Sequence, residues 1–362
     1  MGGSLGLALS SRVGATVIGF DIDADEAQVA LARGCVDRLA GSLVEACVGA
    51  DLVIVATPVS SIAAVIEEVI AATDASTTIT DIGSTKGLVV AGLSAAEQAR
   101  FVGGHPICGS EAHGAAHARA ELFEKATYFL TPTLESEPER ISQVHALVAA
   151  IGARPVVLAA EAHDRIVGLT SHLPHVLANV LALQVAEADV EGHNPLQTAG
   201  GSFRDMTRVA GANPAVWVDI FLANRAAVLV ALEETRARLD RVSKALAEGD
   251  APFLSSWITQ AGSARNKALA LAHRASPADL HEVIVSVSDR RGAISSIAQT
   301  LSAAGINIEE FSLSHISPES GGEIRIVIAG DAQASQAVEL LRADGCTASR
   351  DAVLDDALGG SE

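Results

Sequence analysis

The sequence has 362 residues, with 25 Lys and Arg against 44 Asp and Glu, which gives a formal net charge of −19. This length corresponds to two or three domains, and a hydrophobic content of 49% is too high for a disordered acidic chain. A surface this negative argues against binding of nucleic acid or of an anionic membrane, because both need clustered Lys and Arg.

From residue 13 to 155 the pattern alternates between short apolar strands and helices, the latter for example over 25–33 and 61–71. Such strands are typical of a parallel sheet that is covered by helices on both faces. We therefore predict an α/β, Rossmann-like domain over 1–158. Its expected strands are 15–21, 52–57, 77–81, 100–103, 127–131 and 155–158.

The remaining chain divides into two further predicted domains. Residues 159–277 show helical periodicity and almost no strand pattern, with one long helix expected over 215–246. Residues 278–355 follow the order βαββαβ, which predicts a ferredoxin-like domain, and 356–362 form an acidic tail.

The start of the chain carries a partial dinucleotide-binding pattern. Gly2 and Gly3 precede a helical stretch, and about twenty residues later a predicted strand ends at Asp21. Glycines here let the backbone approach a pyrophosphate, and the acid binds the adenine ribose, which favours NAD over NADP. Gly2 corresponds to the last glycine of the pattern, so the first strand is expected to be missing. Thr57 and Pro58 end a strand where the nicotinamide would lie.

No metal site, disulfide or membrane span is expected. His113 and His117 have metal-ligand spacing but lack a third ligand. Apolar runs are interrupted by charge before the roughly 18–20 residues of a membrane span, and no signal peptide opens the chain. Free thiols in a cytoplasmic protein are therefore expected for the four scattered cysteines, which are Cys35, Cys47, Cys108 and Cys346.

Four polar clusters together closely resemble the prephenate dehydrogenase family. They are DIGSTK (81–86), GHPICGSE (104–111), SHLPH (171–175) and FRDMTR (203–208). The resemblance runs from Gly2 to about residue 267. It implies oxidation of prephenate at its carbinol carbon with hydride transfer to NAD and loss of carbon dioxide, which yields 4-hydroxyphenylpyruvate in tyrosine biosynthesis.

The resemblance also assigns roles to residues. His105 matches the catalytic histidine, which takes the hydroxyl proton as hydride leaves, and Ser84 matches the serine that orients hydroxyl, nicotinamide and base. Among substrate-binding residues, Arg208 matches the carboxylate-binding arginine. The others are His175, supported by His172, together with Glu111 at the pocket mouth, Arg204 at the entrance, and Trp217, which reaches the site from the other subunit of a homodimer built by the helical domain.

The C-terminal part resembles an ACT domain. Its turn signatures are DRRG (289–292) and GINI (305–308). This resemblance implies a regulatory module in which Asp289, Gly292 and Asn307 take part in binding an effector, tyrosine or phenylalanine, that changes the activity of the dimer.

Three other readings stay open at this point. The same fold could act on arogenate, in which an amine replaces the pyruvyl ketone. A β-hydroxyacid dehydrogenase would also join a Rossmann sheet to helices, but it relies on a lysine of the helical domain, and SHLPH is foreign to it. A chain without its first strand could instead be an inactive sensor of amino acids. His163 is given no role, because a lone histidine is more often a surface or core residue. For Lys86 two interpretations stay open, a catalytic lysine as in hydroxyacid dehydrogenases and a solvated loop lysine.

Overall fold

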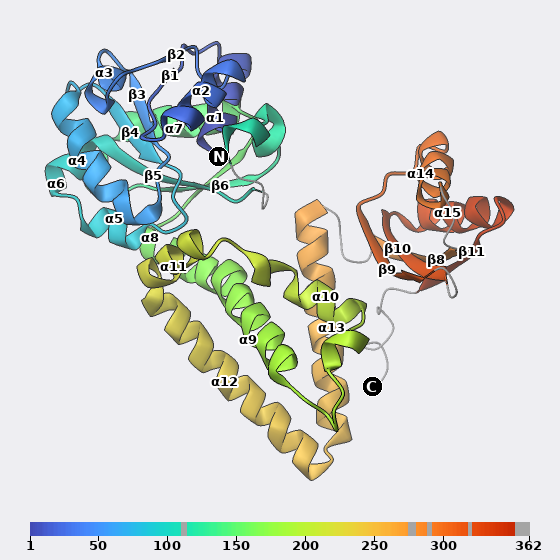
Figure 1. Ribbon diagram of the computed structural model, residues 1–362. Helices are drawn as coiled ribbons and strands as arrows, with labels where there is room; N and C mark the ends of the chain where they lie inside the picture. The colour runs from blue at the N-terminus through green and yellow to red at the C-terminus, as the bar shows by residue number, and fades with distance from the viewer. Residues whose placement is uncertain (110–113, 274–279, 288–291, 318–320, 352–362) are drawn as a thin grey trace, which may run out of the picture. The chain divides into compact units, whose positions relative to one another are not determined.

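The computed structural model describes residues 1–109, 114–273, 280–287, 292–317 and 321–351 (Figure 1). The chain packs into two compact units. The first combines Met1–Glu187 with Thr207–Thr235, and the second combines Ala188–Met206 with Arg236–Glu362. The domain boundaries expected from the sequence stay a prediction.

The first unit contains two sheets. Its strands are β1 (Ile18–Gly19), β2 (Arg38–Leu39), β3 (Leu52–Val55), β4 (Thr78–Asp81), β5 (Phe101–Pro106), β6 (Thr127–Thr131) and β7 (Arg154–Val157). β1 and β2 pair in parallel, and β3 to β7 form a five-stranded sheet in chain order. Pairing in the larger sheet is parallel except between β5 and β6, which run antiparallel. The predicted Rossmann-like fold is confirmed, with this one reversal.

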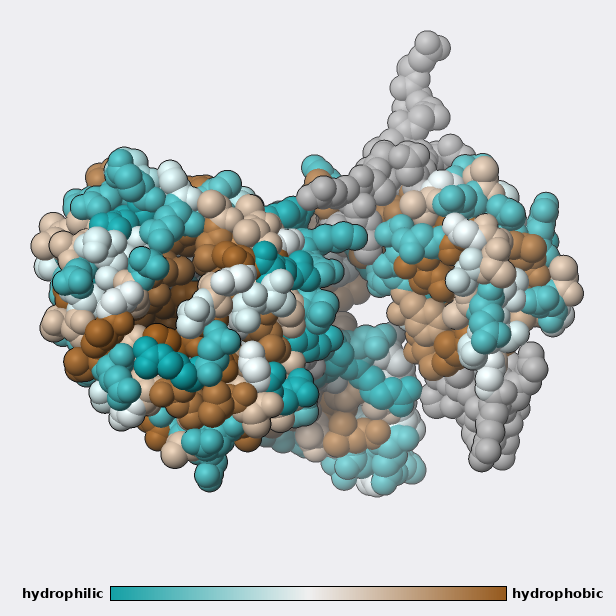
Figure 2. Space-filling view, turned by 90° about the horizontal axis from the view of Figure 1, so that it is seen from above, coloured by the Kyte–Doolittle hydropathy of each residue, from teal (hydrophilic) through white to brown (hydrophobic). Residues whose placement is uncertain are grey.

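Helices cover both faces of the larger sheet (Figure 1). The helices of this part of the chain are α1 (Gly2–Ala8), the π-helical η1 (Leu9–Val13), α2 (Ala24–Ala32), α3 (Leu43–Cys47), the 3₁₀ turn η2 (Val59–Ser61), α4 (Ile62–Ala72), α5 (Gly87–Ala91), α6 (Ala95–Arg100) and α7 (Pro138–Ala150), with the 3₁₀ turns Ala115–His117 and Ala120–Phe123. One core joins α1 and α7 to β5 and β6, and another joins α4 and α5 to β3 and β4. Phe101 and Val102 of β5 point into different cores, as strand alternation requires. Figure 2 shows apolar residues gathered around a recess on the surface of this part of the chain.

The predicted strand 15–21 is largely wrong. Only Ile18 and Gly19 pair, and their partner β2 is equally short. On the N-terminal side the ladder ends where the backbone N–H of Val17 donates to the carboxylate of Asp37 at 2.7 Å. A side-chain acceptor replaces the next backbone partner there, so the strand does not extend.

The helical part of the first unit begins directly after β7. It contains α8 (Ala160–Val167), the π-helical η5 (Gly168–His172), α9 (Leu173–Glu187), the 3₁₀ turn η7 (Arg208–Gly211), α11 (Pro214–Ala223) and the first half of α12 (Arg225–Glu248). The single helix predicted over 215–246 is wrong, because α11 and α12 meet at 86°. Asn224 lies at this break, with φ −108° and ψ 24°, and asparagine side chains compete with helical backbone bonds.

The expectation that no apolar run is long enough to span a membrane is also wrong. Ala160–Glu187 passes that test by length and composition, with a mean hydropathy of 1.5, and so does the bent pair α11 and α12 if it is counted as one span. However, the first segment buries His163, Asp164 and His172 within the unit. Only 22% of its most apolar window is buried.

The second unit contains the 3₁₀ turn η6 (Pro195–Thr198), α10 (Gly201–Thr207), the rest of α12, and α13 (Ala251–His273). Its C-terminal part has the elements β8 (Leu280–Val287), α14 (Ala293–Ala303), β9 (Glu310–Ser317), β10 (Gly321–Ala329), α15 (Asp331–Ala343) and β11 (Thr347–Asp351). The strands form one antiparallel sheet in the order β11-β8-β10-β9, and both helices pack on one face. The predicted βαββαβ order is confirmed.

Candidate active site

His105 lies near the end of β5 and is almost fully buried. Its Nδ1 lies 2.8 Å from Nε2 of His163, a fully buried residue of α8. The Nδ1 of His163 lies 2.8 Å from Oδ1 of Asp164, the next residue. Three side chains therefore form a continuous hydrogen-bonded relay.

Asp164 fixes the direction of the relay. Its carboxylate accepts backbone N–H groups of Lys86 and Gly87 at 2.8 Å each, where α5 begins. Burial alone would raise the pKa of Asp164, but these bonds and the one from His163 outweigh it and hold the pKa below its usual value. An ionised Asp164 needs a proton on Nδ1 of His163, so Nε2 of His163 accepts from Nδ1 of His105. The nitrogen of His105 that stays basic is Nε2.

The surroundings of His105 keep it neutral. Burial lowers its pKa well below 6.5, and the nearby His163, Lys86 and His172 lower it further. A neutral imidazole with one lone pair on Nε2 is equipped to accept a proton near neutral pH.

A buried ion pair supports the same strand ends. Lys86 and Asp81, at the end of β4, are both fully buried and form a salt bridge. Asp81 also accepts the backbone N–H groups of Gly83 at 2.8 Å and Gly104 at 3.0 Å. Burial lowers the pKa of Lys86, against the influence of Asp81 and Asp164. The expectation of a solvated lysine is therefore wrong, because this lysine joins the β4 and β5 ends that carry the site.

His172 occupies the last position of η5, between α8 and α9. It is 1% exposed, and burial lowers its pKa to about 4, with Asp164 opposing and His163 and His175 adding to the shift. The π-helical turn lets the helix continue past Pro174, which has no N–H to donate. His172 and His175 thus project from one uninterrupted helical stretch.

His175, Trp217 and Arg208 form a second cluster in the same unit. Nδ1 of His175 lies 2.9 Å from the carbonyl oxygen of Ser171, and its ring stacks on Trp217 with 3.4 Å between centroids. Burial lowers the pKa of His175, the Ser171 carbonyl raises it, and the charge of Arg208 lowers it. The charge of His172 lowers the pKa of His105, the charge of His175 lowers the pKa of His172, and the charge of Arg208 lowers the pKa of His175. Each of these groups therefore lies close enough to the next for their charges to interact.

The predicted cofactor residues lie at the ends of β1 and β3 and in α1. Thr57 and Pro58 follow β3 and are exposed. A Cβ on Gly2 would lie 3.0 Å from that of Ala56, so the start of α1 packs closely against the end of β3. Asp21 follows β1 and accepts the backbone N–H of Asp23 at 3.0 Å through Oδ1.

Comparisons with known proteins identify the family. The model of the prephenate dehydrogenase nucleotide-binding domain matches residues 5–157, that of the prephenate dehydrogenase dimerization domain matches 159–260, and the ACT domain model matches 281–346. The prephenate dehydrogenase of Bacillus subtilis is 33% identical over 95% of this chain and 93% of its own length. The chain belongs to the prephenate dehydrogenase family.

Solved structures of this family agree with the fold. The prephenate dehydrogenase of Aquifex aeolicus, in complex with hydroxyphenyl propionate and NAD+, has a TM-score of 0.70 and 28% identity, and it covers 73% of this chain and 93% of its own. The arogenate dehydrogenase of Synechocystis has a TM-score of 0.67 and 27% identity, with 73% and 95% covered.

Trp217 contacts two histidines of its own chain. That it reaches the site from the other subunit, as the family resemblance implies, stays a prediction. Here it stacks on His175 of its own chain and lies edge-on to His172, with 6.0 Å between centroids. The helix that carries Trp217 is positioned locally: the side chain of Asn213 caps α11, and α11 lies beside η2, where Ser60 donates to Asp219 at 2.5 Å.

Several predicted prephenate dehydrogenase residues keep their roles as predictions. Ser84 is half-buried in the turn between β4 and α5. Gly3 lies in α1, where a Cβ would meet Sγ of Cys35 at 3.2 Å. Arg204 belongs to the second unit, where its Nη1 reaches the carbonyl of Ala199 at 3.5 Å. Glu111 lies outside the described residues.

In the ACT region, Asp289 also lies outside the described residues. Gly292 caps α14 with φ 86°, a left-handed conformation that favours glycine. The side-chain amide of Asn307 donates to Glu309 at 2.6 Å. Within the described part of the chain no group of three or more metal-ligating side chains is found.

Sequence reasoning missed His163, Asp164 and Asn224. A usable signal existed for the first two. The buried positions of α8 are Ala160, His163, Asp164 and Val167, which is the spacing of a helix face that points inward. Two polar residues on such a face need each other or another buried partner.

Proposed function

We propose that this protein catalyses the NAD-dependent oxidative decarboxylation of prephenate to 4-hydroxyphenylpyruvate. The observation that carries this proposal is His105, held neutral with a basic Nε2 at the end of the relay from Asp164 and His163. NAD supplies the chemistry of hydride acceptance when it is bound. His105 takes the proton of the ring hydroxyl, and Ser84 helps to hold that hydroxyl against the base.

Two cationic or donating groups suit the carboxylates of prephenate. Arg208 can hold one of them through two parallel hydrogen bonds. His175 lies beside Arg208 with Nδ1 directed at a backbone carbonyl, which leaves Nε2 for the ligand. A bound carboxylate favours the protonated form of this imidazole. Trp217, stacked on His175, limits the space beside it.

The N-terminal domain has features that fit NAD. The close approach of Gly2 to Ala56 leaves no room for a larger side chain at the start of α1, as the last glycine of the dinucleotide pattern requires. Asp21 would bind the adenine ribose and repel a 2′-phosphate. Absorbance titration of the purified chain with NAD tests this part, and failure to bind would favour the amino-acid sensor instead.

The reaction itself is tested by following NADH formation with prephenate and, separately, with arogenate. We expect a higher kcat/KM for prephenate, together with release of 4-hydroxyphenylpyruvate. A higher value for arogenate would make this an arogenate dehydrogenase, an outcome that the likeness to the Synechocystis structure keeps open.

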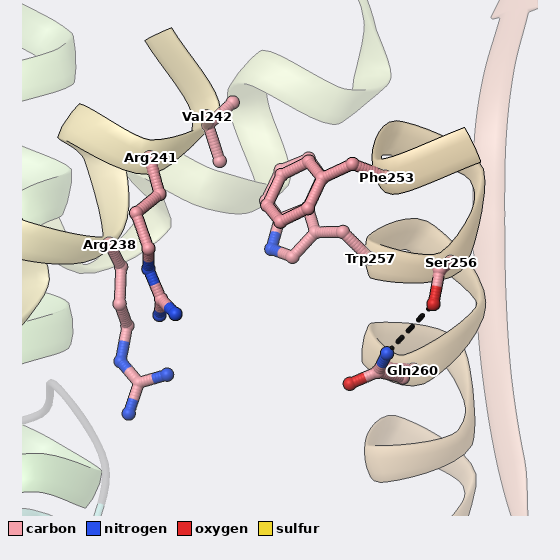
Figure 3. A pocket seen from close by; sticks show the side chains of 7 residues that line it. All are labelled: Arg238, Arg241, Val242, Phe253, Ser256, Trp257 and Gln260. Atoms are coloured by element: carbon pink, nitrogen blue, oxygen red, sulfur yellow. Dashed lines mark hydrogen bonds between the residues drawn. The ribbon is translucent and has the colours of Figure 1, made fainter. Parts of the chain in front are cut away.

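We further propose a homodimer through the helical domain, in the cytoplasm. The match to a dimerization domain supports it, and so do large apolar side chains that the second unit exposes: Leu239, Leu246, Trp257 and Ile258. Trp257 also lines a cavity of about 170 Å³ between α12 and α13, opposite Arg238 and Arg241 (Figure 3). The free cysteines fit a reducing compartment.

Ile258→Glu tests the dimer, because it places a charge on this apolar face. We expect light scattering to give the mass of a monomer for this variant and of a dimer for the parent. Leu134→Glu is the matched control, since Leu134 is fully exposed in the other unit. A parent that is monomeric at micromolar concentration would contradict the proposal.

The ACT domain supports a regulatory role, with tyrosine or phenylalanine as the proposed effector. Ligand that binds only the folded state raises the melting temperature. We expect millimolar tyrosine or phenylalanine to raise the melting temperature of the full chain and to change kcat/KM. Unchanged melting and kinetics with both amino acids would remove this proposal.

A further inference from the structure

Asn224 occupies the sharp bend between α11 and α12 and is only 4% exposed. Its Nδ2 donates to the backbone carbonyl of Asp164 at 2.7 Å and lies 3.0 Å from Nδ1 of His172. One side-chain amide therefore contacts both Asp164, which begins the relay, and His172, which lies edge-on to Trp217 of the second cluster.

The carbonyl of Asp164 fixes the orientation of this amide. A backbone carbonyl can only accept, so the amide nitrogen of Asn224 must face it, and an amide nitrogen has two protons to donate. The second proton points at Nδ1 of His172, which must therefore present a lone pair. His172 is thus neutral, with its proton on Nε2.

We propose that Asn224 is a positioning residue for the reaction, which sets the tautomer of His172 and ties that imidazole to the Asp164–His163–His105 relay. The role in turnover rests on the proposed function, whereas the effect on His172 does not. His172 lies edge-on to Trp217, and Trp217 stacks on His175. Asn224 therefore contacts both parts of the site. It donates to the backbone of Asp164, which begins the relay to His105, and it lies against His172, which is next to Trp217 and His175.

The charged and titratable groups around His172 favour the same protonation state overall. Asp164 and His163 face it from α8, and His175 faces it from α9. Asp164 favours a proton on His172, while the two histidines and burial oppose it, and the net effect is a pKa of about 4. The amide of Asn224 also disfavours protonation of His172, because the Nδ1–H of an imidazolium would point at the amide N–H.

Asn224→Asp tests the proposal with almost no change in shape. A carboxylate cannot donate to the Asp164 carbonyl, and it attracts a proton to Nδ1 of His172. By imidazole nitrogen NMR we expect the proton to move to Nδ1 and the pKa of His172 to rise by about two units or more. We expect kcat/KM for prephenate to fall about tenfold or more and to gain a new ionisation near neutral pH.

Asn213→Asp is the matched control at the other end of α11. It makes the same change of charge, but aspartate preserves the cap that Asn213 gives to Ala215. We expect the His172 spectrum and the pH profile of this variant to equal those of the parent.

Unchanged His172 nitrogen shifts in Asn224→Asp would overturn the proposal, whether or not the melting temperature falls. The NMR readout needs no substrate, so it remains decisive if the chain does not oxidise prephenate. If the aspartate variant does not fold, Asn224→Ser, which has a single donor, is expected to give a mixture of His172 tautomers, and a single parent-like tautomer would contradict us.

Discussion

Replacing His105 by asparagine is expected to lower kcat by about 10²–10⁴-fold with little change in KM. The asparagine amide can still donate to Nε2 of His163, so the relay stays satisfied and only the proposed proton acceptor is lost. In the parent enzyme, burial lowers the pKa of His105 well below 6.5. Because the base must be neutral, kcat/KM should hold as pH falls through 6.5 and decline only below the lowered pKa.

Arg208→Gln provides the matched contrast, since it removes the proposed carboxylate-binding group and leaves the proposed base in place. We expect mainly a higher KM for prephenate, with kcat changed much less. Initial-rate kinetics over a pH range measure both variants. If Arg208→Gln lost kcat and His105→Asn raised KM, the roles of base and anchor would have to be exchanged.

Lys86→Met is expected to lower the free energy of unfolding by about 3–5 kcal/mol, because it leaves the carboxylate of Asp81 buried without its cation. Asp81 also holds the backbone N–H groups of Gly83 and Gly104, so the ends of β4 and β5 should loosen together. Urea denaturation followed by circular dichroism measures the loss.

The double variant Asp81→Asn with Lys86→Met separates the buried charge from the lost contact. An uncharged asparagine keeps hydrogen-bonding capacity, so we expect the pair of changes to cost less than Lys86→Met alone. If Lys86→Met alone were as stable as the parent, the positive charge of Lys86 would not be needed to stabilise the buried carboxylate of Asp81.

The helices and strands that position the site could be predicted from the sequence, whereas most contacts within the site could not. The strand that leads to His105 could be predicted over 100–103, because parallel strands are short, apolar and followed by polar residues, although β5 extends to Pro106 and includes His105. The bend at Asn224 was not predicted, because an apolar pattern continues through α11 and α12, and only the partners of the asparagine side chain show why the helix ends there.

His163 escaped prediction for a different reason. Its partner His105 lies 58 residues away, and the contact depends on how α8 packs against the β5 end, which a linear pattern does not encode. Lys86 is the opposite case. Asp81 lies five residues before it, at the end of a fully buried strand, and a buried carboxylate needs a nearby cation.

The π-helical turn over Gly168–His172 sets the direction in which the side chains of α9, the helix that follows it, point from the helix axis. A turn of this kind holds about one residue more than an α-helical turn, and one residue corresponds to about 100° of rotation around the axis. Without that extra residue, the same amino acids would continue as a straight helix, and the imidazole of His175 would point to another side, away from the indole. Changes of the exposed side chains of Leu169 and Thr170 should therefore be tolerated over evolutionary time, whereas deletion of a single residue from this stretch should not.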